Sequence, residues 1–232
     1  MHDQPLGLTI HSLPTPREAA AHDAQRTTRG RWRMIAVMLV CAAPVVASYL
    51  TYYVIRPSAQ RSYGELIEPQ RPLPDVPALA LDGRTISLPS LRGQWLLVSV
   101  AGGACDALCE RHLYLQRQLR ESLGKDKDRL DWVWLVSDDV PVREALRPAL
   151  AQAAVLRVDA KQLSGWLAPA AGHQLRDHLY LVDPLGHWMM RFPATSSSGA
   201  IDTAAAAKVK RDVERVLRAS ASWDEAGRPP AR

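Results

Sequence analysis

The sequence lacks the patterns that mark several large functional classes. Its net charge of +5 comes without a basic cluster interleaved with aromatic residues, so nucleic-acid binding is unsupported. It has no arrangement of serine, histidine and acidic residues that indicates a catalytic triad, and no glycine-rich phosphate loop. Hydrolase and nucleotide-binding interpretations are therefore excluded. No internal repeat is evident, so a single domain is the simplest expectation.

Cysteine is scarce, and its three positions limit where sulfur chemistry is located. Cys41 lies inside a long apolar run, where it is expected to pack as a small apolar side chain. Any thiol or metal chemistry therefore belongs to Cys105 and Cys109.

Residues 34–55 form a run of 22 residues without a charged side chain. As a helix this run is about 33 Å long, enough to cross a bilayer. Four arginines crowd its N-terminal side and only two follow it closely, which predicts a cytoplasmic amino end and a periplasmic C-terminal part. These arginines are Arg26, Arg29, Arg31 and Arg33 before the run and Arg56 and Arg61 after it. A cleaved signal peptide is the alternative, but the long leader and the apolar stretch up to Ile55 favour a single-pass anchor in the cell inner membrane.

Four further segments are expected around this helix. Residues 1–33 show no hydrophobic periodicity, which is typical of a disordered cytoplasmic tail. Prolines punctuate residues 56–73 and favour an extended linker. Residues 74–220 are long enough for one globular domain with its own core. Residues 221–232 are expected to be a disordered tail.

Within residues 74–220, short apolar runs alternate with amphipathic segments. An apolar strand leads directly to a cysteine-headed helix, and a hairpin and a helix close the domain. This is the element order of a thioredoxin-like domain, so we predict an α/β thioredoxin-like fold behind one N-terminal transmembrane helix. Strands are expected at residues 76–81, 84–88, 95–100, 132–136, 155–158, 178–182 and 187–192. Helices are expected at 105–123, 142–152, 161–167 and 204–219, the second of them interrupted or bent near Pro148.

Cys105 and Cys109 begin the helix that follows the strand of residues 95–100. Two thiols four residues apart at a helix start lie one turn apart on one face. The unpaired N–H groups and the helix dipole at this end stabilise thiolates, which are the species that bind metals or exchange disulfides. In an oxidising compartment, a plain structural disulfide is the competing interpretation.

His178, at the head of the strand expected at residues 178–182, is the candidate third ligand. Copper(I) is soft and accepts two cysteines and one histidine, whereas structural zinc normally has four protein ligands. Asp177 either orients this imidazole or only begins the strand. His112 shares a helical face with the two cysteines and is a rival ligand, although a buried structural role is favoured for it.

With these motifs the chain resembles the Sco/SenC family of copper-binding proteins that assist cytochrome c oxidase assembly. The resemblance rests on Leu-Arg-Gly-Gln-Trp at residues 91–95, on the spacing between Cys105 and Cys109, and on Asp-His at residues 177–178 before the strand.

The resemblance implies that Cys105, Cys109 and His178 bind copper. It also implies that the domain delivers copper to the copper subunit of the oxidase or to another copper-assembly protein, without enzymatic turnover. Asp106 and Glu110 stand where this family usually has proline, so the chain would be a divergent member. Two alternatives stay open. One is a membrane-tethered thiol–disulfide reductase with Cys105 and Cys109 as its catalytic residues, and the other is a metal-free structural or assembly partner.

Overall fold

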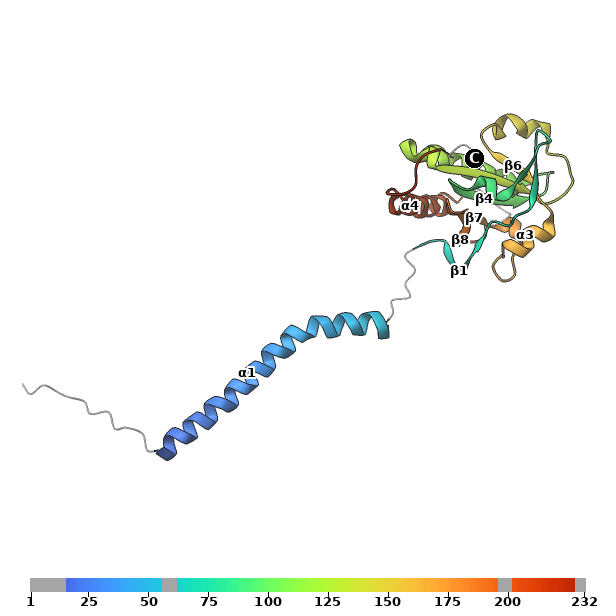
Figure 1. The fold of residues 1–232 in the computed structure, drawn as a ribbon. Coiled ribbons are helices and arrows are strands. Elements are labelled where there is room, and N and C mark those ends of the chain that lie inside the picture. The colour runs from blue at the N-terminus through green and yellow to red at the C-terminus, as the bar shows by residue number, and fades with distance from the viewer. Residues whose placement is uncertain (1–15, 56–61, 196–201, 228–232) are drawn as a thin grey trace, which may run out of the picture. The chain divides into compact units, whose positions relative to one another are not determined.

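The structure is a computed structural model, and it describes residues 16–55, 62–195 and 202–227 (Figure 1). The chain separates into two units, Met1–Ala59 and Gln60–Arg232. Parts of the expected tails and linker lie outside the described residues, as does a serine-rich loop; these are residues 1–15, 56–61, 196–201 and 228–232.

The first unit contains the long helix α1 (Pro16–Leu50), followed by a π-helical turn η1 (Thr51–Ile55). Its stretch Arg29–Tyr53 is long and apolar enough to cross a membrane, and contains an 18-residue window with a mean hydropathy of 2.1. The expected membrane-spanning helix is therefore present as a candidate span. Residues 16–33, expected as part of a disordered tail, instead belong to α1. Alanine, glutamate, glutamine and arginine in this stretch are good helix formers and extend the apolar helix backwards.

The second unit is built on a mixed sheet, which has eight strands in the described part of the chain. The order across the sheet is β1-β8-β7-β4-β5-β6-β2-β3. β4, β5 and β6 are parallel, and every other neighbouring pair is antiparallel. The strands are β1 (Glu65–Pro72), β2 (Pro77–Ala80), β3 (Thr85–Ser87), β4 (Trp95–Ala101), β5 (Leu130–Val136), β6 (Ala154–Arg157), β7 (Leu179–Val182) and β8 (His187–Arg191).

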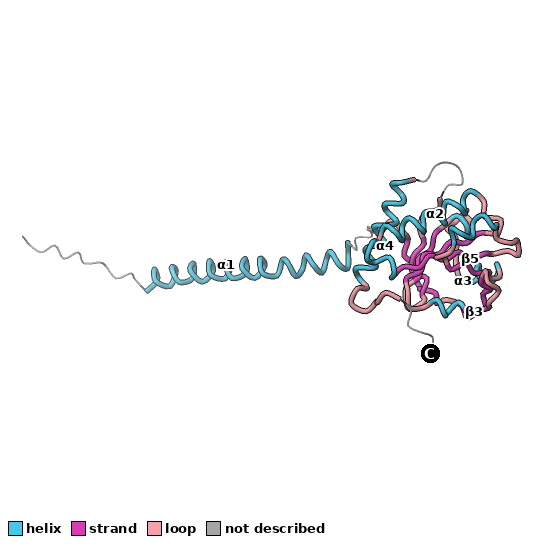
Figure 2. Tube along the Cα trace, turned by 90° about the horizontal axis from the view of Figure 1, so that it is seen from above, coloured by secondary structure: helices cyan, strands magenta, loops and turns pink. Residues whose placement is uncertain are grey.

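Helices cover both faces of this sheet, with α2 (Ala107–Ser122) and α4 (Thr203–Ala219) on one face and α3 (Ala160–Trp166) on the other (Figure 2). Side chains alternate along the central strand β4 because a strand has a period of two. Leu97 packs with Leu119 of α2 and Val213 of α4. Its neighbour Val98 packs with Trp166 of α3. All seven residues of β4 are buried, as its apolar sequence predicts.

The start of the domain differs from the expectation, since residues of the predicted linker form the edge strand β1 paired with β8. Pro69 and Pro72 fit there because an edge strand does not need every N–H for the ladder. The N–H groups of Tyr63 and Gly64 donate to Asp212 on α4, at 2.6 and 2.9 Å. The folded unit therefore begins about ten residues earlier than predicted.

The helix expected at residues 142–152 is replaced by the short 3₁₀ helix η4 (Glu144–Leu150). Pro148 lies inside it and lacks the N–H that an α-helix would need there. The shorter helix leaves residues 137–143 outside any helix or strand.

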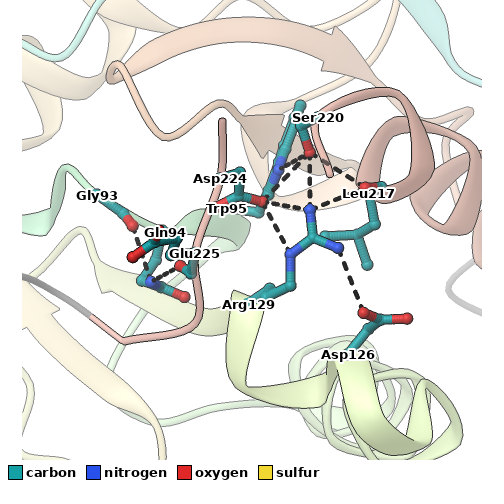
Figure 3. A network of polar contacts seen from close by, with 9 residues as sticks. All are labelled: Gly93, Gln94, Trp95, Asp126, Arg129, Leu217, Ser220, Asp224 and Glu225. Atoms are coloured by element: carbon teal, nitrogen blue, oxygen red, sulfur yellow. Dashed lines mark hydrogen bonds and ion pairs between the residues drawn. The ribbon is translucent and has the colours of Figure 1, made fainter. Parts of the chain in front are cut away.

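Residues 221–227, expected within a disordered tail, are held to the domain by a buried polar network (Figure 3). The Arg129 guanidinium donates to Asp224 at 2.8 and 3.2 Å and to Ser220 Oγ at 3.0 Å. Trp95 Nε1 donates to the same hydroxyl at 3.1 Å. Because Asp224 is buried and paired, this segment is part of the folded unit.

Candidate functional site

The two cysteines lie where β4 turns into α2. The turn Gly102-Gly103 follows β4, and Asp106 caps the helix by accepting a hydrogen bond from Cys109 N–H at 3.1 Å. Aspartate is a preferred N-cap residue because its carboxylate satisfies an N–H that has no partner inside the helix. The helix therefore begins at Ala107, two residues after its predicted start.

Cys105 and Cys109 form a disulfide, with their Cα atoms 5.1 Å apart. Cys105 has a φ of +45°, in the left-handed region that residues other than glycine rarely adopt. Its N–H donates to Gly102 O at 3.1 Å, which closes the turn before the helix. Non-glycine residues in such a conformation cluster at functional sites, which directs attention to this pair.

Both cysteines are buried, each with 3% of its surface exposed. They pack in an apolar cluster with Trp134 of β5, and with Val142 and Leu150 from the segment around η4. The cluster that encloses the disulfide thus includes side chains some forty positions further along the chain. Because both cysteines are almost fully buried, a thiol from outside reaches them only when neighbouring residues move.

Charged groups surround the helix start. The hydrogen bond from Cys109 N–H holds the pKa of Asp106 below its ordinary value, and the nearby Arg176 acts in the same direction. Asp106 and Arg176 form an ion pair. Arg143 forms another with Glu110, and it also donates to the carbonyl of Cys105 at 2.6 Å. The partial positive charge at a helix start favours a thiolate. The negative carboxylate of Asp106 lies at the same helix start and offsets part of this effect.

His178 is buried, and both of its ring nitrogens are used by the backbone. Nδ1 lies 2.8 Å from Phe192 O, and Nε2 accepts from Ala170 N–H at 3.1 Å. This pattern requires a neutral ring with its proton on Nδ1. Burial lowers the pKa of His178, which agrees with a neutral imidazole. Asp177 accepts from Gln174 N–H at 2.8 Å, so it belongs to the turn before β7.

His112 lies on α2, one turn after Cys109, and is 1% exposed. Its Nε2 is buried without a hydrogen-bond partner in the described part of the chain. Burial lowers the pKa of His112 to about 4. The structure thus places it in the interior, as the sequence analysis favoured.

The described residues contain no group of three histidine, cysteine, aspartate or glutamate side chains arranged to hold a metal. Cys105 and Cys109 form a disulfide, and His178 does not form a three-ligand group with them in the described residues. In this arrangement the sulfurs share a covalent bond and the imidazole is engaged by the backbone, so the three side chains do not fit a copper ion. Copper binding by the reduced thiols stays a prediction.

Arg143 and Arg176 are contacts of the site that the sequence analysis missed. They lie 38 and 70 residues from their partners Cys105 and Asp106. No local spacing rule connects residues so far apart, so the sequence held no signal for them.

Comparisons with known proteins agree with this architecture. The sequence model described as "Transmembrane-like, thioredoxin-like, C-terminal domain" matches residues 95–220, more than half of the chain. The expected thioredoxin-like α/β fold is thereby confirmed. A search of curated proteins finds no match.

Solved structures of three bacterial proteins are similar at low identity. The thioredoxin domain of a thiol-disulfide oxidoreductase from Bacteroides vulgatus is 15% identical, with 63% of this chain and 95% of that chain covered and a TM-score of 0.45. A SCO1/SenC family lipoprotein from Bacillus anthracis is 16% identical, with coverages of 65% and 99% and a TM-score of 0.47. Apo Sco1 from Thermus thermophilus is 14% identical, with coverages of 69% and 99% and a TM-score of 0.49.

Proposed function

The chain belongs to the family of transmembrane-like, thioredoxin-like C-terminal domains, and from this premise we propose that Cys105 and Cys109 exchange disulfides with the thiols of a client protein at a membrane surface. The observation that carries the proposal is the disulfide at the start of α2, directly after the central strand β4. Thiols at a helix start are suited to exchange because thiolates are stabilised there. The arginines before residue 34 support a periplasmic location for this domain.

The exchange moves two electrons and two protons. A thiolate of the client attacks one sulfur of the pair, the bond between Cys105 and Cys109 breaks, and a mixed disulfide forms. The second client thiol then attacks the mixed disulfide and releases the chain as a dithiol and the client as a disulfide. In the opposite direction, the reduced pair returns the same electrons and protons to a client disulfide, which is the reductase activity.

The test is turnover by the full chain in detergent, with insulin as a disulfide substrate and dithiothreitol as the electron source. We expect Cys105→Ser and Cys109→Ser each to abolish turnover above the uncatalysed rate. His178→Ala is expected to retain it, because the imidazole is not needed for exchange between sulfurs. Rates in both serine variants equal to that of the unchanged chain would contradict the proposal.

Copper binding by the reduced chain is the second proposal, with Cys105, Cys109 and His178 as ligands and an oxidase copper subunit or another copper-assembly protein as partner. The pairing of β7 with β4 supports it, because Leu179 lies opposite Ser99 and carries His178 toward the end of β4. The ion pair of Arg176 with Asp106 ties the preceding turn to the cysteine-bearing helix start.

A copper(I) titration of the reduced full chain against a chromophoric competitor tests this second proposal. We expect one ion per chain and at least a tenfold loss of affinity in His178→Ala, which is about 1.4 kcal/mol. His173→Ala, a neighbouring histidine that is half exposed, is the matched control. An affinity unchanged in His178→Ala would remove that residue from the ligand set.

A further inference from the structure

The segment Asp138–Leu150, which we call the strap, lies beside the disulfide and shares its apolar cluster. Val142 and Leu150 are 6% and 4% exposed and pack in the same apolar cluster as the two cysteines. The strap follows the end of β5 and includes the short helix η4. Its contacts with Cys105 and with the cluster make it the candidate for the part that moves when a thiol reaches the buried pair.

The first three residues of the strap are firmly fixed. Asp138 accepts a hydrogen bond from Gly103 N–H at 2.8 Å. Arg157 donates to the carbonyls of Asp139 and Val140 at 3.1 and 3.0 Å. A Cβ atom added at Gly103 would lie 1.9 Å from Val140 O, so the cysteine turn and the strap approach as closely as their backbones allow.

The rest of the strap is held differently. The Arg143 guanidinium donates to Cys105 O at 2.6 Å and forms an ion pair with Glu110 of α2. Leu146 N–H donates to Arg143 O at 3.0 Å, a bond that stays inside the strap. Residues 141–150 are therefore able to lift together once Val142, Leu146 and Leu150 leave the cluster and Arg143 releases its two partners. The side chains of Arg143 and Glu110 are 46% and 49% exposed. Because water competes for this ion pair, breaking it costs little free energy.

We propose that Arg143 controls access to the disulfide and selects its clients. While Arg143 holds Cys105 O and Glu110, the strap is closed and small thiols are excluded from both sulfurs. A polypeptide dithiol with a carboxylate near its thiols opens the strap, because that carboxylate replaces Glu110 on the guanidinium, whose planar fork matches carboxylates. This inference rests on the proposed exchange function only for the identity of the client.

The access step is measurable without any client. Excess dithiothreitol supplies a thiolate that attacks one sulfur and breaks the disulfide, and its second thiol completes the reduction as a cyclic disulfide, so two electrons and two protons pass to the cysteines. With the strap in a rapid opening equilibrium, the observed rate is proportional to the fraction of open molecules. The rate is followed in the full chain in detergent by quenching with acid and labelling the new thiols with a heavy maleimide.

We expect the disulfide of Arg143→Gln to be reduced about tenfold faster than that of the unchanged chain. The variant loses hydrogen bonds made by a charged group, and the loss of one such bond corresponds to about a tenfold change in the open fraction. Glu110→Gln is expected to accelerate reduction by a smaller factor, and Arg143→Lys to lie between the glutamine variant and the unchanged chain. Arg147→Gln is the matched control, since Arg147 also lies on the strap but pairs with Glu144. Its rate should be unchanged. Urea midpoints of all variants check that the fold itself is unaltered.

The inference is overturned if Arg143→Gln is folded and is reduced at the rate of the unchanged chain, or if Arg147→Gln is accelerated as much as Arg143→Gln. A selective acceleration by the Arg143 and Glu110 variants supports it. The insulin assay tests the exchange function and not the access step. Unchanged turnover in the serine variants would contradict the exchange function, but it would not change the rates of disulfide reduction measured for the Arg143 variants. A carboxylate-bearing dithiol peptide that reacts no faster than its amide analogue would contradict the selection of clients.

Discussion

At the residue scale, Asp106 has two opposing effects on the site. It caps α2 through Cys109 N–H, and it places a negative charge at the helix start that carries the two cysteines. Its ion pair with Arg176 offsets part of that charge. The reactivity of the reduced pair therefore depends on a residue that does not take part in the exchange itself.

Asp106→Asn separates these two effects. Asparagine caps helices as well as aspartate does, so the fold should be retained while the charge is removed. We expect a larger thiolate fraction and a roughly threefold faster reaction of the reduced cysteines with iodoacetamide, a neutral reagent. Glu214→Gln, a charge removal on α4, is the control and should have no effect. A slower reaction in Asp106→Asn would show that the carboxylate does not oppose the thiolates.

His112 predicts how stability depends on pH. Burial lowers its pKa from 6.5 to about 4 in the folded chain. Between these values the unfolded chain binds a proton that the folded chain does not, so the free energy of unfolding should rise with pH across this window. The slope is at most about 1.4 kcal/mol per pH unit. Above pH 6.5 the histidine is neutral in both states, so the rise in the free energy of unfolding due to His112 ends there.

Urea midpoints of the full chain in detergent, measured at several pH values, test this dependence. His112→Gln removes the titrating group and should flatten the profile in the acidic window, whatever its effect on stability at neutral pH. His187→Gln, at a partly exposed histidine in the same unit, is the matched control. An equal slope in His112→Gln and in the unchanged chain would assign the dependence to other groups.

At the scale of elements, the end of the chain is fastened to the turn between α2 and β5. Arg129 belongs to that turn, and Asp224 follows α4. Their ion pair is largely removed from water, with side chains 11% and 1% exposed. Trp95 joins the same network through Ser220, so the start of the central strand is fastened as well.

Asp224→Ala leaves the Arg129 guanidinium without its buried carboxylate. Loss of one partner of a buried pair typically costs about 3 kcal/mol, because the remaining charge stays desolvated. We expect a loss of this size in the free energy of unfolding, measured with urea on the full chain. Asp128→Ala breaks the more exposed pair with Arg120 and should cost less than about 1 kcal/mol. Similar losses in the two variants would show that burial does not strengthen the first pair.

At the scale of the whole molecule, the candidate span and the cysteine domain are separate units of the same chain. A disulfide that cycles through exchange needs an oxidising compartment or a supply of electrons, so the side of the membrane on which the domain lies decides what the pair does.

The arginine distribution predicts that the domain lies outside the cytoplasm. In bacterial spheroplasts that express the full chain, protease added outside should digest the domain without lysis. Replacing the arginines before residue 34 with glutamine should raise the protected fraction, because the positive-inside bias is then weakened. Full protection of the unchanged chain until lysis would contradict the predicted topology.

The sequence alone determined the features that depend on neighbours along the chain. Alternating and apolar runs predict β4, β5 and β7, and the 3.6-residue period predicts α2 and α4, because these patterns report which side of one element is buried. The position of Cys105 and Cys109 at a helix start was also predictable, because it depends only on the strand before them and the helical pattern after them.

Only the tertiary structure decided the surroundings of these elements. The strap beside the disulfide and the network around Arg129 join residues far apart in the sequence. The backbone groups that bind His178 come from positions 8 and 14 residues away, in segments outside its own strand. Hydrogen-bond partners and burial depend on what lies across space, and a single sequence encodes them only through the complete fold.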